Sequence, residues 1–97
     1  MAHYVALLKL TPEGAKSLKD GPQRLAKANE LMTAAGAKFT AAYATLGQYD
    51  YVFVIEGPED VSKVFQVSAA AAMMGAHSLQ TMPAIPLAEF QKLVADL

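Results

Sequence analysis

Cysteine is absent from this 97-residue chain. Its absence excludes disulfide bonds, thiolate catalysis and zinc sites built from cysteine. The chain also lacks any apolar run close to the roughly 20 residues that cross a bilayer. Its N-terminus has no basic region followed by a cleavable apolar segment. We therefore expect a cytoplasmic protein that does not bind membranes.

Charge is scarce and nearly balanced, with 8 Lys and Arg against 9 Asp and Glu, for a net charge of −1. Nucleic-acid binding is not expected, because it needs a basic footprint that this composition does not supply. The charge is unevenly placed, however. Residues 1–38 carry six basic and three acidic side chains, whereas residues 39–97 carry two and six.

Hydrophobic residues make up 54% of the chain, against about 45–50% for a comparable set in average domains. A chain of this length buries only roughly 60–68% of its unfolded surface. Because monomers seldom expose large apolar patches, the surplus predicts a subunit interface. We expect one domain over residues 1–97 whose main partner is a second copy of itself.

The stretch 39–56 is central to the predicted fold. Two apolar runs flank the sequence Gly-Gln-Tyr-Asp at 47–50, which contains the turn residues of a hairpin connection. The whole pattern predicts strands at 2–10, 38–46, 51–55 and 77–82, and helices at 12–19, 22–35, about 61–75 and 87–97. This βαββαβ order with a C-terminal helix predicts an α+β, ferredoxin-like domain with a four-stranded antiparallel sheet.

Both parities of the runs 2–10 and 51–55 are apolar, as in strands covered on both sides. Helices should cover one face of the sheet, and the sheet of a second copy should cover the other. The sequence thus predicts a dimeric α/β barrel, or a larger even ring. It leaves open which parity faces the helices; Phe53 is one candidate for the outer face. In the last helix, Leu87, Phe90 and Val94 are expected to face inward.

Four short motifs support this assignment. They are Tyr4-Val5-x-Leu7-Leu8-Lys9, Thr11-x-x-Gly14, Lys19-Asp20-x-Pro22-x-Arg24 and Leu46-Gly47-x-Tyr49-Asp50. In these motifs the chain resembles the GYD domain family of small, dimeric α/β-barrel proteins. The resemblance extends over nearly the whole chain and implies the fold, but it implies no general reaction. Gly21 departs from the hydroxyl residue that the family often has there, although glycine is also a tolerable helix cap.

Tyrosines are the first candidate site residues. Tyr43, Tyr49 and Tyr51, together with Tyr4, could line a cavity between sheet and helices, where a hydroxyl can donate a hydrogen bond or act as a weak acid. Asp50 beside them could act as a base. Alternatively, these tyrosines pack within strands and Asp50 holds the turn.

Basic residues form the second group. They are Lys9, Lys16, Lys19, Arg24 and Lys27. On an ideal helix, positions 16, 19, 24 and 27 would share a face able to hold an anion. The alternative is an ordinary solvated face, interrupted at Gly21 and Pro22. Lys19 and Arg24 flank this helix break, where backbone amides are free; with Lys9, they are the predicted anion-binding residues.

His3 and His77 are the side chains that titrate near neutral pH. If their strands are adjacent, they could meet at one edge of the sheet. No spacing in the chain is diagnostic of a metal site, and the methionines at 73, 74 and 82 are interpreted as packing residues. We expect neither a metal nor a cofactor.

Two functions remain open. In the first, each barrel binds a small anionic molecule or catalyses cofactor-independent proton transfer. The catalytic residues would be Tyr49, Asp50 and His77, and the ligand-binding residues Lys9, Lys19, Arg24, Tyr43 and Tyr51. In the second, the protein is a non-enzymatic oligomeric regulatory or scaffolding module. Both require the same assembly, so only a polar-lined cavity would separate them.

Overall fold

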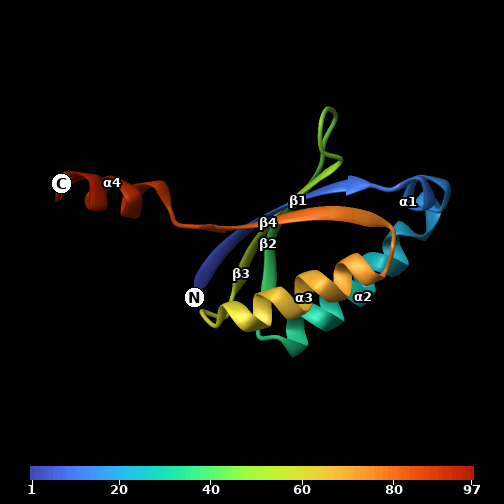
Figure 1. Cartoon of the computed structure of the whole chain (residues 1–97), viewed down its shortest axis with the longest axis horizontal. Helices are drawn as coiled ribbons and strands as arrows, with labels where there is room; N and C mark the ends of the chain where they lie inside the picture. The colour runs from blue at the N-terminus through green and yellow to red at the C-terminus, as the bar shows by residue number, and fades with distance from the viewer.

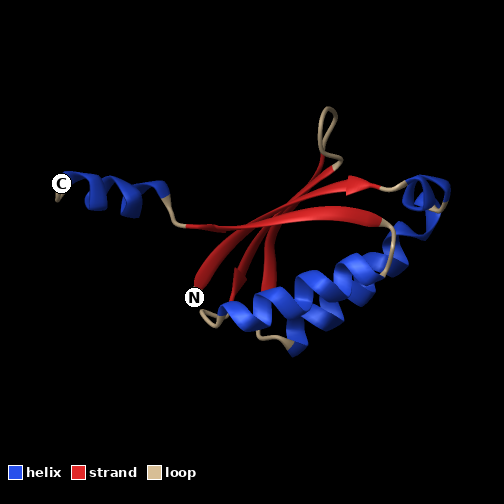
Figure 2. Ribbon diagram, in the orientation of Figure 1, coloured by secondary structure: helices blue, strands red, loops and turns tan.

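The computed structural model describes all 97 residues as a four-stranded antiparallel sheet with its two long helices on one face (Figures 1 and 2). The strands are β1 (Ala2–Leu10), β2 (Lys38–Ala44), β3 (Tyr51–Gly57) and β4 (His77–Ala84). The helices are α1 (Pro12–Lys16), the 3-10 turn η1 (Leu18–Asp20), α2 (Gly21–Ala34), α3 (Val61–Met73) and α4 (Leu87–Ala95). The strand order β2-β3-β1-β4 is that of a ferredoxin-like α+β fold, which confirms the predicted fold class.

Local sequence explains where the helices begin and end. The Thr11 side chain accepts a hydrogen bond from the Gly14 amide at 3.0 Å and caps α1. In the same way, Asp60 accepts from the Ser62 amide at 3.0 Å and caps α3. Gly36 follows α2 with a φ of 76°, a backbone conformation that glycine adopts without steric cost.

The helix predicted over 12–19 is split. It ends at Lys16, the 3-10 turn follows, and α2 then begins at Gly21 with a φ of −50°. The basic residues of this region therefore do not lie on one continuous helix. The stripe that an ideal helix would place on a single face is not formed.

A β-bulge in β2 changes which side chains share a face. Phe39 pairs with Ile55, but after the register shift Ala42, rather than Ala41, pairs with Phe53. Phe39 and Ala42 consequently point toward the helices. Tyr43 is paired one position further along, on the opposite parity.

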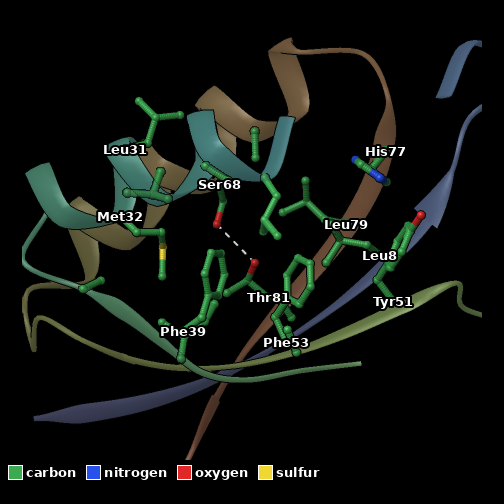
Figure 3. Close-up of a pocket in the computed structure, with 18 of the residues that line it drawn as sticks. Leu8, Leu31, Met32, Phe39, Tyr51, Phe53, Ser68, His77, Leu79 and Thr81 are labelled. Carbon is green, nitrogen blue, oxygen red and sulfur yellow. Dashed lines mark hydrogen bonds between the residues drawn. The ribbon is translucent and has the colours of Figure 1, made fainter. Parts of the chain in front are cut away.

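Strand β1 shows which parity faces the helices. Tyr4, Ala6 and Leu8 are buried, whereas Val5 and Leu7 of the other parity are only half-buried and Lys9 is exposed. Phe53 pairs with Ala6 and points into the space below the helices (Figure 3), so its assignment to the outer face is wrong. The outer face is instead built around Val5 and its neighbours, and no helix covers it (Figure 1).

Helix α4 lies apart from the rest of the chain. Strand β4 continues through Pro83 to Ala84 and carries the helix beyond the end of the sheet (Figure 1). A proline is tolerated there because β4 is an edge strand. Leu87, Phe90 and Val94 are 69%, 50% and 45% exposed, so the prediction that they face inward within their own chain is wrong.

No helix in the structure combines the length and apolar character needed to cross a membrane.

Candidate functional site

A cavity of about 630 Å³ lies between the inner face of the sheet and helices α2 and α3 (Figure 3). Phe53 and Leu79 line it from the sheet, and Leu31 and Met32 from α2. Of its 31 lining residues, 22 are hydrophobic. Its size and apolar walls are typical of sites that bind small organic molecules.

Small side chains explain why this space is hollow. Ala28 of α2, Ala35 at its C-cap, Ala71 of α3, and Ala6 and Ala42 of the sheet all line it. Alanine extends only a methyl group from the backbone, so two layers held apart by neighbouring aromatic rings leave a gap. Phe39 and Phe53, whose ring centroids are 4.9 Å apart, lie on the sheet side of that gap.

Two polar contacts in the wall are already satisfied. Ser68 Oγ and Thr81 Oγ1 share a hydrogen bond of 3.2 Å that links α3 to β4 (Figure 3). The Tyr4 hydroxyl donates to the Pro58 carbonyl at 2.7 Å. Sequence reasoning identified Tyr4 but missed the hydroxyl pair, although a serine before four alanines and a threonine in a short strand are visible polar interruptions of apolar segments.

A polar corner of the cavity is formed by His77, Tyr51 and Arg24. The rings of Tyr51 and His77 meet edge to face, with centroids 5.4 Å apart and an interplanar angle of 81°. Burial lowers the pKa of His77 below its ordinary value, and the positive charge of Arg24 lowers it further, while Asp50 opposes part of this change. The imidazole is therefore neutral at neutral pH.

Arg24 has unused hydrogen-bonding capacity. Its Nη1 donates to the carbonyl and the hydroxyl of Ser17, at 3.0 and 3.1 Å. Its Nε is buried and has no hydrogen-bond partner. Neither of the two ion pairs in the chain includes Arg24. The guanidinium is thus a half-buried positive charge without a carboxylate partner.

Asp50 has a clear structural position. Its carboxylate Oδ2 accepts from the Leu10 amide at 2.8 Å, and its own amide donates to the Leu8 carbonyl at 2.8 Å. These contacts continue the pairing of β1 and β3 past the last regular ladder position. Asp50 therefore holds the hairpin loop against β1; its role is structural, but its carboxylate bonds the neighbouring strand rather than the backbone of its own turn.

Tyr49 lies outside the cavity. Its hydroxyl donates to Gln80 Oε1 at 3.0 Å, and Gln80 pairs with Leu7 on the outer parity of the sheet. His77 lies on the inner parity, next to the cavity. The three residues predicted as catalytic, at 49, 50 and 77, thus do not converge on one point, because the sheet separates the Tyr49 hydroxyl from the imidazole.

The predicted ligand-binding residues also divide into two groups. Arg24 and Tyr51 line the cavity; Tyr43 borders it at β2, but its pairing with Val52 puts its side chain on the outer parity. Lys9 and Lys19 are exposed and do not line it. Their roles as ligand-binding residues stay predictions.

The two histidines lie at opposite ends of the β1–β4 pair. His3 pairs with Ala84, whereas His77 pairs with Leu10. The expectation that His3 and His77 meet at one edge is therefore wrong. Adjacent antiparallel strands bring residues together only where the register pairs them.

Comparison with known families gives one match that spans most of the chain. The model of the GYD domain matches residues 4–94. A Thermus thermophilus protein named glutamine synthetase and cystathionine beta-lyase binding protein is 37% identical over 90 residues. This alignment covers 92% of the present chain and 94% of that protein.

Solved structures show the same fold at low sequence identity. The crystal structure of an FFRP protein has a TM-score of 0.58 at 18% identity, covering 88% of this chain and all of that one. A hypothetical protein from Pyrococcus horikoshii has a TM-score of 0.53 at 18% identity, covering 89% and 92% of the two chains.

Proposed function

Because the chain belongs to the GYD domain family, we propose that it is a self-associating module that binds other proteins, with no catalytic step of its own. One observation carries this proposal: the outer face of the sheet and one face of α4 are apolar, and neither is covered by the chain itself. Their burial requires a second protein surface.

The outer sheet face presents a row of apolar side chains at its centre, next to the polar Gln80 on the edge strand β4. Its central members are Val5, which pairs with Val54 and Met82, and Leu7, which pairs with Val52 and Gln80. In a normal antiparallel sheet with helices on one side only, this face would be polar. A second copy offers the same row, and a two-fold axis can place the two rows together.

Helix α4 provides a second apolar surface. Its large exposed side chains are Leu87, Phe90, Leu93, Val94 and Leu97 of the C-terminal segment. Each apolar Å² removed from water contributes about 25 cal/mol, so a helix of this kind is stable in place only when its apolar side is covered. We propose that α4 packs against a second polypeptide.

The nature of the other partner is suggested by the relative. The Thermus thermophilus protein is named for binding two enzymes, glutamine synthetase and cystathionine beta-lyase. The corresponding proposal for this chain is that its assembled form binds metabolic enzymes. No catalytic triad is needed for this role, which agrees with the separation of Tyr49 from His77.

Light scattering coupled to size exclusion tests the self-association. Val54→Lys places a charge in the outer row, and Gln66→Lys adds the same charge to an exposed position of α3. We expect an oligomer for the wild type and the Gln66 variant, and a monomer for the Val54 variant. A chain ending at Pro86 lacks α4, and we expect it to associate more weakly with its second copy. Its circular dichroism spectrum should still show the folded sheet. A monomeric wild type would overturn the proposal.

Enzyme binding is tested with purified components. Glutamine synthetase and cystathionine beta-lyase from the same host are titrated into the protein by calorimetry, with an unrelated oligomeric enzyme as control. Saturable binding to either enzyme, lost in the Val54 variant or the shortened chain, supports the proposal. Absence of binding to both would restrict the module to self-association.

A second candidate function is binding of a small molecule, which is favoured by the cavity of about 630 Å³. The geometry supports binding better than proton transfer. The carboxylate of Asp50 is engaged by the Leu10 amide, and the Tyr49 hydroxyl lies on the other face of the sheet.

A further inference from the structure

We propose that the cavity binds a monocarboxylate with an apolar body, whose carboxylate pairs with Arg24 while its body lies between the sheet and helices α2 and α3. This inference rests on the second candidate function and gives it a ligand class. The polar corner of the cavity would hold the carboxylate, and the apolar remainder would hold the body of the ligand.

The apolar body is indicated by the walls. Away from the polar corner most lining residues are alanine, leucine, valine, methionine and phenylalanine, and Lys63 is an exposed member of the lining. The hydroxyls of Ser68 and Thr81 bond to each other, and that of Tyr4 donates to the Pro58 carbonyl. A polar ligand body would find few unpaired partners there and would lose hydrogen bonds to water. A hydrocarbon chain or ring loses nothing and gains about 0.8 kcal/mol for each buried CH₂ group.

The carboxylate is indicated by the geometry of the Arg24 guanidinium. Nη1 is occupied by Ser17, so Nε and Nη2 remain, and Nε is buried without a partner. These two nitrogens form one edge of the guanidinium, and that edge can donate two parallel hydrogen bonds to one carboxylate once the side chain turns to expose the buried Nε. A bound carboxylate would satisfy the orphaned Nε and neutralise Arg24, which is half-buried, whereas Lys63, the other cation of the cavity lining, is exposed to solvent.

A single negative charge fits the surroundings. His77 is neutral and therefore offers an N–H donor without adding charge to the corner. Asp50 acts on the same imidazole through its negative charge, and that charge would repel a second charge on the ligand. Arg24 supplies one positive charge, and the negative charge of Asp50 acts on the same imidazole without pairing with Arg24, so a monoanion is favoured over a dianion such as phosphate.

Decanoate, 1-decanol and inorganic phosphate are the probes, each titrated into the full-length protein by calorimetry and by amide NMR. Decanoate has both required parts, decanol has only the body, and phosphate has only the charge. We expect saturable decanoate binding with shifts in α2, α3 and β4, and at least about tenfold weaker binding of decanol. Absence of saturable decanoate binding would overturn this inference, and absence of decanol binding as well would count against the second candidate function.

Decanol bound as tightly as decanoate would overturn the carboxylate class alone and leave the apolar pocket standing. Tight phosphate binding with no gain from the decyl chain would overturn the apolar body. The assembly tests above do not depend on either result, so the failure of the ligand class remains distinguishable from failure of the protein-binding function.

Variants locate the two parts of the site. Arg24→Gln should weaken decanoate binding by about tenfold or more. Lys27→Gln, one turn further along α2 and paired on the surface with Glu30, is the matched control and should leave affinity unchanged. Equal effects of the two substitutions would overturn the assignment to Arg24.

A cavity-filling variant tests the site independently, in case Arg24→Gln weakens binding only by destabilising the fold. Ala71→Leu inserts a larger side chain into the cavity from α3, and this change should preserve the thermal midpoint because it fills empty space. We expect it to weaken decanoate binding by about tenfold. Unchanged affinity in a folded Ala71→Leu variant would place decanoate elsewhere and contradict the proposal.

Discussion

The carboxylate of Asp50 accepts a hydrogen bond from the backbone amide of Leu10, forty residues earlier in the chain, at 2.8 Å. The Asp50 amide donates to the Leu8 carbonyl, and its carbonyl accepts from the Thr45 amide, both at 2.8 Å. One residue thus joins the hairpin loop to the end of β1. This position fixes the loop relative to the corner that holds His77.

Replacing Asp50 should therefore reduce stability first. Asp50→Ala leaves the half-buried Leu10 amide without its acceptor, and we expect the free energy of unfolding to fall by about 1.5–3 kcal/mol. Urea denaturation measures the change. Gln48→Ala, an exposed substitution in the same loop, should change stability by less than about 0.5 kcal/mol. Full stability of the Asp50 variant together with lost ligand binding would instead make Asp50 a binding residue.

Gly14 has no room for a side chain. A Cβ built there would collide with the carbonyl of Ala76, which also accepts the Thr11 amide at 3.0 Å. Gly14→Ala must therefore displace backbone that joins α1 to the start of β4. We expect a loss of about 3 kcal/mol in the free energy of unfolding, measured by urea denaturation.

Gly21 is the matched control for this substitution. Apart from its chain neighbours and the backbone of its own helix, no atom lies within 4 Å of the point that a Cβ would occupy at this residue, and its φ of −50° suits any residue. Gly21→Ala should be neutral or stabilise the protein by up to about 1 kcal/mol, because it restricts the unfolded chain. If the two substitutions had equal effects, the steric explanation for Gly14 would fail.

The fold was predictable because its signals are local. The turn residues near Gly47, the cap at Thr11 and the apolar run that starts at Tyr51 each specify one element, and their order specifies the sheet. Similarly, Asp50 was a recognisable turn residue. Such features need no knowledge of distant contacts.

The parts that could not be predicted depend on register and chain direction. Phe53 and Val54 are both apolar, so only the pairing of Phe53 with Ala6 shows which of them faces the helices. The bulge after Phe39 likewise reverses the parity of β2 without an obvious sequence signal. Helix α4 would have an apolar side whether it packed on its own sheet or on another protein. The direction in which β4 leaves the sheet determines that α4 lies away from the core of its own chain.

The candidate site shows the same division. Arg24 and Tyr51 were identified from residue type, but their meeting at one end of an apolar cavity depends on how α2 crosses the sheet. Tyr49 was grouped with them because it is a neighbour in sequence. Its hydroxyl bonds to Gln80 on the other face.

The pH dependence of stability provides a last test of the polar corner. Burial, and then the charge of Arg24, lowers the pKa of His77 in the folded protein below its ordinary value of about 6.5, with Asp50 acting in the opposite direction. Between the folded and unfolded pKa values, the unfolded state binds more protons. The free energy of unfolding must therefore fall as the pH decreases through this interval, below about pH 6.5.

Urea denaturation at a series of pH values measures this dependence. His77→Gln removes the titrating group, and we expect the variant to lose less stability than the wild type as the pH is lowered from neutral through the interval below about 6.5. His3→Gln removes the other histidine, which lies at the far end of the β1–β4 pair, and should retain the wild-type slope. If His77→Gln kept the full wild-type dependence of unfolding free energy on pH, the His77 imidazole would not be desolvated by the cavity. His77 would then not be a neutral N–H donor for a bound carboxylate.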